Sequence, residues 1–459
     1  MNAQRITLVV ACLGILLAQL DTSVINLVTH RLHDAFHTDD ATLRWFVDAY
    51  NVAYAAAILS AGGLGDRLGR RRIFVIGLAV FTVGSAACAL APNAATLVAA
   101  RAFTGLGAAL EVPATLALLS VAFPEGAERA KALGVWAAMN GLAFAVGPPL
   151  GGGLADAFGW RSVFAVAIPV ALVALVLARR AAAPEPVPSR AFDVAGQLWA
   201  AAALGTLTFA AMAAGSREFV TAGAWFAGAL ACGVAFIVQE RRAAEPLLDL
   251  TLFRDRPFDA ATFCTACMTF GMYGLLYLTP LVLQAFRHFG TMLAGVMLLP
   301  LSAIFVVVSA RSGAIVERLG TRATIAIGMA CMGIGSITLG IDVGARLWTT
   351  ALGLGIAGVG LGFTTGPLLG YAVARAPHER AGIASGVGNA ARMIGATLGV
   401  AVLGGAFGHA SALDVTPIRI AYAGGGAIEL LGALVAWFGI VEAREAVSRR
   451  PAALRRGAA

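Results

Sequence analysis

The sequence predicts an all-α polytopic membrane protein that crosses the bilayer about fourteen times. Of its 459 residues, 59% are hydrophobic types and only 13% are charged, and the mean hydropathy is +0.82. Soluble domains carry roughly 25% charged residues. The apolar residues also gather in successive runs of about 20 residues, the length that spans the hydrocarbon core as a helix.

Short polar segments separate the apolar runs, and each run is expected to be one helix. The first run follows Arg5, as in a signal peptide. However, it is longer than the apolar core of a signal and contains Asp21, so we expect it to be retained. The predicted spans are 6–28, 43–64, 73–91, 95–121, 133–154, 161–178, 194–214, 220–238, 258–283, 293–310, 323–341, 347–374, 383–407 and 420–441.

Basic residues are distributed unequally between the segments that join these spans. If the N-terminus is cytoplasmic, 24 of the 33 lysines and arginines lie on the inner side and seven on the outer side. Cytoplasmic loops carry such an excess, so we expect a multi-pass protein of the cell (inner) membrane with both termini in the cytoplasm. The net charge of +8 is explained in the same way, and no nucleic-acid partner is expected.

An internal repeat indicates how the spans are organised. The stretch "GGLGDRLGRRR" from Gly62 is similar to "GAIVERLGTRA" from Gly313, 251 residues later, and "ERA" recurs at Glu128 and Glu379 with the same offset. Two parallel six-helix halves explain this pattern. We predict an N-terminal six-helix bundle at 1–180, a linker with two additional transmembrane helices at 181–256, a C-terminal six-helix bundle at 257–441 and a cytoplasmic tail at 442–459.

These stretches resemble the major facilitator superfamily, specifically its fourteen-span drug:proton antiporters (EmrB/QacA type). "LDTSVINLV" from Leu20, "RAFTGLGAA" from Arg101 and "GPPLGGG" from Gly147 are similar to the family's motifs in helices 1, 4 and 5. The resemblance implies a major facilitator fold of two six-helix bundles plus two extra helices. It departs from the family at Ala143, where glycine is frequent, and in the span 383–407, which contains Arg392 but no acid.

The loop after the second span and the fifth span carry two of these motifs. In the resembled family the loop stabilises one conformation of the transport cycle, and the fifth-span motif is associated with antiporters. Glycines permit a tight turn, and Asp66 is placed to accept N–H groups or to pair with an arginine, although the arginines could serve only as topology anchors. The predicted gating residues are Gly62, Asp66, Arg67, Gly69, Arg70, Arg71, Glu317 and Arg318, and the antiporter motif is Gly147, Pro148, Gly151 and Gly152.

Charged residues within the spans are few, and each costs on the order of 2.5–3.5 kcal/mol at mid-membrane. Asp21, Asp48 and Arg101 fall at comparable depth in the outer half of the bilayer. An exporter needs a carboxylate that alternates between proton and substrate. We predict Asp21 as that group, tuned by Arg101, with Asp48 and Glu111 as further proton or substrate sites. A purely structural role remains the alternative for each of them.

Other polar and aromatic residues of the spans are candidates for the substrate cavity, although hydrogen bonding between helices is their commoner use. Arg392 and Glu429 lie at mid-depth on successive antiparallel helices, and we predict that they form a structural ion pair. No metal site and no cofactor are predicted. The predicted cavity residues are Asn26, Trp45, Tyr50, Trp136, Asn140 and Asn389.

The predicted function is proton-coupled efflux of hydrophobic or cationic small molecules, such as drugs and antibiotics, by alternating access. The alternative is proton-coupled export or import of one specific endogenous metabolite. The sequence contains no G-x-x-x-x-G-K-[ST] loop, which excludes ATP as the expected energy source, and no cluster of catalytic groups suggests an enzyme. The expected partners are a small-molecule substrate, protons and the lipid bilayer, and the protein is expected to be a monomer.

Overall fold

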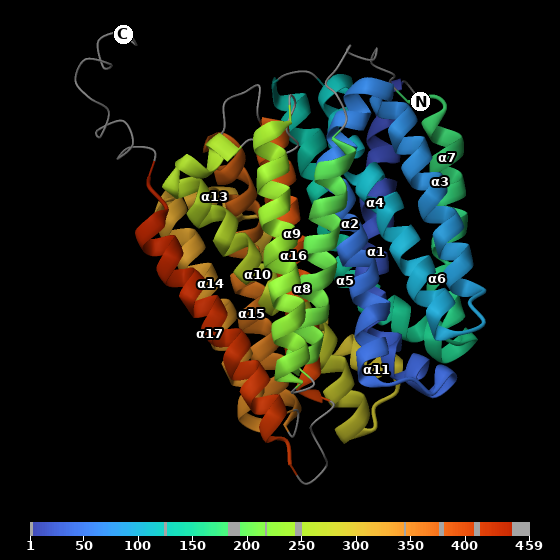
Figure 1. The fold of residues 1–459 in the computed structure, drawn as a ribbon, viewed down its shortest axis with the longest axis vertical. Helices are drawn as coiled ribbons and strands as arrows, with labels where there is room; N and C mark the ends of the chain where they lie inside the picture. Colours follow the sequence, from blue (N-terminus) through green and yellow to red (C-terminus); the bar gives the residue numbers. More distant parts are fainter. Residues whose placement is uncertain are drawn as a thin grey trace.

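The computed structural model describes residues 3–123, 126–181, 193–215, 218–243, 250–343, 346–375, 381–407 and 414–442. All regular structure in these ranges is helical, which confirms the predicted fold class (Figure 1). The helices are α1 Ala3–Phe36, α2 Asp40–Leu68, α3 Arg70–Ala89, α4 Ala94–Ala122, α5 Gly126–Phe158, α6 Arg161–Ala165, α7 Ala167–Ala178, α8 Val194–Gly215, α9 Phe219–Arg242, η1 Leu250–Arg254, α10 Arg256–Arg287, α11 Thr291–Val296, α12 Leu299–Ser309, α13 Ser312–Leu319, α14 Thr321–Asp342, α15 Leu347–Arg375, α16 Ala381–Gly405 and α17 Thr416–Gly439.

Twelve helical segments of the described residues are long and apolar enough to cross a membrane. They coincide with twelve of the predicted spans, and the pairs α6–α7 and α11–α12 each occupy one of them. The two other predicted spans, 43–64 and 133–154, fall on α2 and α5, whose side chains the structure describes only in part. The count of fourteen spans therefore stays a prediction.

Side-chain caps fix where α2 and α4 begin. The carboxylate of Asp39 accepts the backbone N–H of Thr42 at 3.0 Å, and the side-chain oxygen of Asn93 accepts that of Thr96 at 2.9 Å. Both satisfy N–H groups that have no partner within the helix. Hydrogen bonds from the hydroxyl and the backbone N–H of Thr42 lower the pKa of Asp39, so this residue keeps its negative charge at the positive end of the α2 dipole.

We call helices α1–α7 the N-terminal half and α10–α17 the C-terminal half, and these two parts share packing details at the predicted offset of 251 residues. Gly69 and Gly320 precede α3 and α14 as their N-cap residues, with positive φ angles of 93° and 83°. Gly77 lies so close to α4 that a Cβ atom there would be 2.7 Å from it, and Gly328 lies equally close to α15. The repeat seen in two loops therefore extends into helix packing.

We expect Gly77→Ala and Gly328→Ala each to lower the melting temperature of the detergent-purified protein. A methyl group at either position overlaps the neighbouring helix, and forcing extra atoms into a packed interior costs about 1–3 kcal/mol. Gly424→Ala is the matched control, because no atom lies within 4 Å of a Cβ at that position. Equal melting temperatures for Gly77→Ala and Gly424→Ala would contradict this packing.

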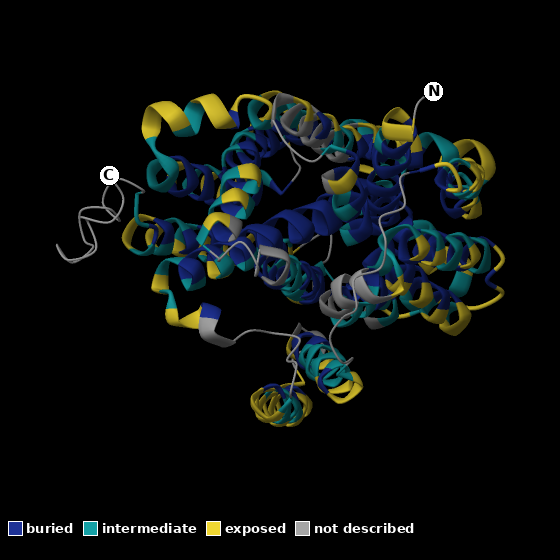
Figure 2. Cartoon of the chain, turned by 90° about the horizontal axis from the view of Figure 1, so that it is seen from above, coloured by how far each residue is buried: buried dark blue, intermediate teal, exposed yellow. Residues whose placement is uncertain are grey.

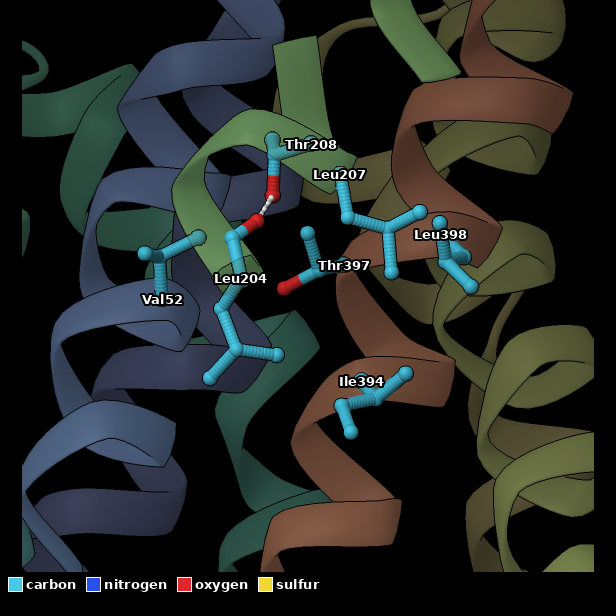
Figure 3. Close-up of a pocket in the computed structure, with 7 residues that line it drawn as sticks. All are labelled: Val52, Leu204, Leu207, Thr208, Ile394, Thr397 and Leu398. Atoms are coloured by element: carbon cyan, nitrogen blue, oxygen red, sulfur yellow. Dashed lines mark hydrogen bonds between the residues drawn. The ribbon is translucent and has the colours of Figure 1, made fainter. Parts of the chain in front are cut away.

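The two additional helices α8 and α9 form a hairpin beside the two halves (Figure 2). α8 packs against α2 of the N-terminal half and α16 of the C-terminal half, whereas α9 packs against α8. Between α2, α8 and α16 lies an apolar pocket of about 10 Å³ (Figure 3). A water molecule needs roughly 10–15 Å³, so this pocket is a packing gap and not a substrate site.

The two ends of the bundle differ in what they carry. α1 begins and α17 ends at one end, and the connection between α1 and α2 lies at the opposite end, at the bottom of Figure 1. We call this opposite end the distal end. It is the outer end if the termini are cytoplasmic, as the arginine distribution predicts.

Candidate functional site

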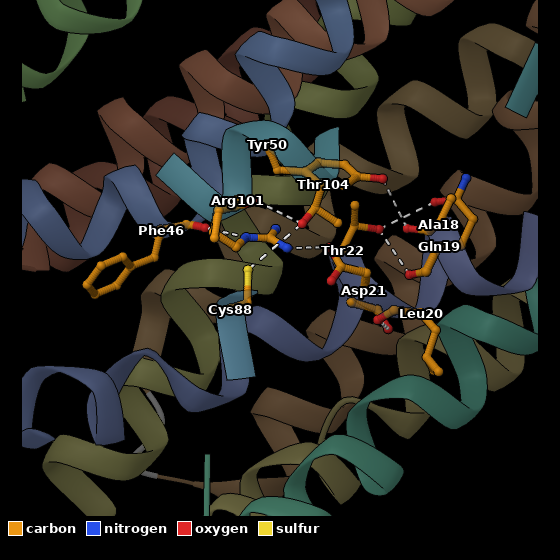
Figure 4. A network of polar contacts seen from close by, with 12 residues as sticks. Ala18, Gln19, Leu20, Asp21, Thr22, Phe46, Tyr50, Cys88, Arg101 and Thr104 are labelled. Atoms are coloured by element: carbon orange, nitrogen blue, oxygen red, sulfur yellow. Dashed lines mark hydrogen bonds and ion pairs between the residues drawn. The ribbon is translucent and has the colours of Figure 1, made fainter. Parts of the chain in front are cut away.

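An arginine and an aspartate from different helices meet inside the N-terminal half. Nη1 of Arg101, on α4, donates to Oδ2 of Asp21, on α1, at 2.5 Å (Figure 4). Nε of Arg101 donates to the carbonyl oxygen of Phe46, on α2, at 2.7 Å. The sequence predicted equal depth for Asp21 and Arg101, and the structure brings them together. One guanidinium thus ties together three helices.

Aromatic rings enclose this ion pair. The guanidinium carbon of Arg101 lies 4.8 Å from the ring centroid of Tyr50 and 5.9 Å from that of Phe164. Arg101 is 0% exposed and Asp21 is 7% exposed. A pair without water around it is screened far less than a surface pair. Any change in the protonation of Asp21 would therefore act strongly on the packing of α1, α2 and α4.

Two further carboxyl groups are buried nearby and lack hydrogen bonds. Both oxygens of Asp48, on α2, and both oxygens of Glu111, on α4, have no hydrogen-bond partner among the described residues. Arg44 lies one turn before Asp48 and acts on it electrostatically, whereas the charged neighbour of Glu111 is the like-charged Asp21. Burial of an ionised carboxylate without a partner is very costly, so Glu111 is suited to binding a proton.

Of the predicted cavity residues, Tyr50 lies beside the ion pair, whereas Asn26 and Trp136 make hydrogen bonds elsewhere. Nδ2 of Asn26 donates to a backbone carbonyl of its own helix at 3.4 Å, and Nε1 of Trp136 donates to Oγ1 of Thr115 at 2.9 Å. Such bonds correspond to the structural use of polar residues in membranes. Asn389 is half-buried on α16, and the side chain of Asn140 lies outside the described residues.

Trp45 lies on the side of α2 that faces the α8–α9 hairpin. Its ring centroid is 4.7 Å from that of Phe209, which stacks on Trp225 at 4.8 Å. A hollow of about 650 Å³ beside Trp45 and Phe209 lies at the distal surface, between α2, α4 and α8. Because residues five apart on a helix point in different directions, Trp45 and Tyr50 face different neighbours. These contacts do not support the assignment of Trp45 to the substrate cavity.

The predicted gating loop is described in part. Gly69 adopts the positive φ angle expected of a tight turn. Nη1 of Arg71 donates to the carbonyl oxygens of Arg179 and Ala181, both at 3.3 Å, within the N-terminal half. Arg70 is half-buried on α3, and the side chains of Asp66 and Arg67, as well as the surroundings of Gly62, lie outside the described residues. The matching Glu317 and Arg318 are exposed on α13.

The glycines of the predicted antiporter motif bring α5 close to both halves. A Cβ atom on Gly147 would overlap Ser23 of α1, and one on Gly152 would lie 2.6 Å from Met292 of α11. A Cβ atom on Gly151 would lie 2.8 Å from Val24 of α1, and one on Gly295 of α11 would overlap the carbonyl oxygen of Pro148. The motif therefore lies at the contact between the two halves.

Sequence reasoning missed a group of contacts that joins the halves at the distal end. Arg31, on α1, pairs with Asp156, on α5, and its Nε donates to Oγ1 of Thr291, on α11, at 2.8 Å. The other oxygen of Asp156 accepts the backbone N–H of Met292 at 2.8 Å. We call these four residues the distal latch. No local pattern could reveal it, because its members lie about 125 to 260 residues apart.

We expect Arg31→Ala to shift the protein towards conformations with an open distal end. The change removes the hydrogen bond from Arg31 to Thr291, which crosses the halves, and the ion pair that orients Asp156 towards Met292, together worth about 1–2 kcal/mol. Paramagnetic labels at Phe158 and Leu293, exposed residues flanking the latch, should report longer distances. Arg161→Ala is the control, since the contacts of Arg161 with described residues are to Ala91 and Trp160, both of the N-terminal half. An unchanged distance distribution in Arg31→Ala would contradict the latch.

The predicted ion pair between Arg392 and Glu429 is wrong. Oε2 of Glu429, on α17, accepts the hydroxyl of Ser336, on α14, at 2.5 Å, and Oε1 of Glu429 lies against Gly271 of α10. Arg392 instead acts electrostatically on Tyr54, of α2, and on Tyr273, of α10. α17 packs against α14 and α10, whereas α16 packs against α10 and α2. Arg392 and Glu429 were predicted to pair because they lie at similar depth in the membrane. Their side chains, however, point towards different neighbouring helices.

Comparison with known sequences identifies relatives along most of the chain. The sequence model of the Major Facilitator Superfamily matches residues 11–400. "Multidrug resistance protein Stp" of Mycobacterium tuberculosis (strain CDC 1551 / Oshkosh) is 38% identical over 408 residues, covering 88% of this chain and 76% of the relative. "Methylenomycin A resistance protein" of Bacillus subtilis (strain 168) is 32% identical over 435 residues, covering 94% and 93%.

A third relative and a solved structure agree with this result. "Tetracenomycin C resistance and export protein" of Streptomyces glaucescens is 34% identical over 414 residues, covering 87% of this chain and 75% of the relative. The partially occluded inward open xylose transporter XylE from E. coli superimposes with a TM-score of 0.68 at 16% identity, covering 96% of this chain and 99% of that structure, which shows the fold alone. This multi-pass membrane protein therefore belongs to the Major Facilitator Superfamily of transporters.

Proposed function

We propose that this protein exports hydrophobic small molecules of the drug and antibiotic kind in exchange for protons. The observation that carries the proposal is the buried group formed by Asp21, Arg101 and Glu111. It places an enclosed ion pair within electrostatic reach of a carboxyl group that has no hydrogen-bond partner among the described residues. Such a group can take up and release a proton while the charge on the neighbouring pair resists or permits helix movement.

Three relatives support export as the direction of transport. Their names describe multidrug resistance, methylenomycin A resistance, and tetracenomycin C resistance and export. Resistance by transport requires that the compound leave the cell. The closely packed antiporter motif between α5, α1 and α11 fits the same direction, because it holds the two halves together where they must rock against each other.

We place the protein in the cell (inner) membrane as a monomer with cytoplasmic termini. The excess of arginine and lysine on the side of the termini supports this orientation. The distal latch then holds the halves together at the outer face, and access from the cytoplasm would lie at the opposite end. A drug dissolved in the cytoplasmic leaflet or the cytoplasm would enter in this state.

The proposal is tested first in growth and then in vesicles. A panel of antibiotics in a pump-deficient host identifies a compound against which the protein protects. Inverted vesicles with an acidic lumen should accumulate that compound, and accumulation should cease when the gradient is dissipated. Asp21→Asn should abolish it, whereas Asp34→Asn, at an exposed residue of the same helix, should not. Release of the compound from the acidic lumen would instead indicate uptake into cells.

A further inference from the structure

Arg392 is a charged residue of the C-terminal half that the proposed proton exchange does not use. It lies eleven residues from the start of α16, hence about 16 Å along that helix. The residue is half-buried, and its Nε has no hydrogen-bond partner among the described residues. Leaving a buried hydrogen-bond donor without a partner costs free energy in a membrane protein. A bound ligand could supply the missing acceptor.

The packing of α16 fixes the direction in which Arg392 points. Gly395 and Gly399 lie against the backbone of α10, where a Cβ atom would overlap the chain. Arg392 precedes them by three and seven residues and so lies on the same side of the helix. The next residue, Met393, packs with Tyr54 in a cluster of the N-terminal half. Arg392 therefore lies where α16 meets α10 and α2.

Aromatic residues of both halves surround this position. The charge of Arg392 acts on Tyr54, of α2, and on Tyr273, of α10. These rings are 5% and 1% exposed. Glu111, which belongs to the same half as Tyr54, also acts on this tyrosine. An acid of one half and a base of the other thus approach the same tyrosine, and neither forms an ion pair with a described residue.

We propose that Arg392 binds an anionic or acceptor oxygen of an aromatic substrate whose ring packs against Tyr54 and Tyr273. A guanidinium offers only donors, in a fork that matches a carboxylate or a pair of neighbouring oxygens. Flat rings beside it favour a flat, apolar ligand body. A cationic group would be repelled at the same place. This inference rests on the proposed export function and narrows its substrate class to acidic or oxygen-rich aromatic molecules.

Binding to the purified full-length protein tests this assignment without any proton gradient. The probes are three fluorescent anthracenes with one ring system, namely anthracene-2-carboxylate, its neutral carboxamide and the cationic 2-(aminomethyl)anthracene. Each is titrated by fluorescence polarisation against wild type, Arg392→Gln, Arg392→Lys and the control Arg419→Gln, which changes an exposed arginine of α17. Failure of proton coupling would not affect these titrations, so the two proposals can fail separately.

Wild type should bind the carboxylate at least about tenfold more tightly than the carboxamide, the ratio that corresponds to one charge-assisted contact. This preference should disappear in Arg392→Gln, persist in reduced form in Arg392→Lys and remain intact in Arg419→Gln. The comparison of carboxylate with carboxamide on wild type needs no variant, so misfolding of Arg392→Gln cannot hide the result. Equal binding of the two anthracenes, tighter binding of the cation, or no saturable binding of the carboxylate would overturn the assignment.

Discussion

Replacing Arg101 with leucine should destabilise the protein more than any other single change considered. The variant leaves Asp21 buried without its cation and leaves the carbonyl oxygen of Phe46 without its donor. Breaking a buried pair in this way costs about 3–5 kcal/mol. We expect the purified variant to aggregate at markedly lower temperature than wild type and to transport nothing.

The double variant Asp21→Leu with Arg101→Leu separates stability from function. In the double variant no buried charge is left without a partner. Replacing both members of a buried ion pair by apolar residues often changes the stability little. The double variant should therefore recover most of the melting temperature while remaining inactive. Arg101→Lys keeps the charge but cannot donate to Asp21 and Phe46 with one planar group, so we expect an intermediate result. Wild-type stability of Arg101→Leu alone would show that the pair is not a structural link.

Replacing Glu111 with glutamine should uncouple transport from the proton gradient. Glutamine has the shape of the protonated acid, and no described group depends on a charge at this position. We expect wild-type melting behaviour, but a loss of gradient-driven accumulation of at least about tenfold, within the range seen when a positioned proton-transfer group is removed. Exchange of labelled for unlabelled compound across vesicles without a gradient should continue, because it needs no net proton movement.

Asp48→Asn provides the comparison within the same fold. Arg44 acts on Asp48, so this acid already has a cation nearby, and its replacement should affect accumulation less than that of Glu111. Glu218→Gln, at an exposed acid before α9, should leave both assays unchanged. If Glu111→Gln accumulated the compound at the wild-type rate, Glu111 would not be the proton carrier, and Asp21 would remain as the candidate.

Hydropathy and the internal repeat predicted most of the fold. The length of each apolar run indicates the length of the corresponding span. The stretch "RLG" recurs in two loops 251 residues apart, which indicated two equivalent halves. The structure adds that Gly77 and Gly328 occupy equivalent close contacts at this offset. The division of single spans into α6–α7 and α11–α12 was not predicted, since the apolar pattern continues across each break.

The sequence predicted correctly that Asp21 and Arg101 lie close together, because their depth in the membrane was enough to decide it. It predicted the pair of Arg392 and Glu429 wrongly, because the direction in which each side chain points from its helix also mattered. Asp21 and Arg101 meet because their helices are neighbours and their depths agree. Arg392 and Glu429 also agree in depth, but helix azimuth depends on packing between distant segments, which one sequence does not reveal. The hydrogen bond from Ser336 to Glu429 and the ion pair of Arg31 with Asp156 belong to the same class of long-range contacts.

The α8–α9 hairpin makes the two flanks of the molecule unequal. α8 lies across the junction of α2 and α16, while the junction of α5 with α11 and α12 lies on another side and has no such cover among the described helices. A lipophilic compound diffusing in the bilayer would thus reach the interior by the uncovered flank only. If the halves rock as we propose, α8 would also have to slide along at least one of its two neighbours, α2 or α16.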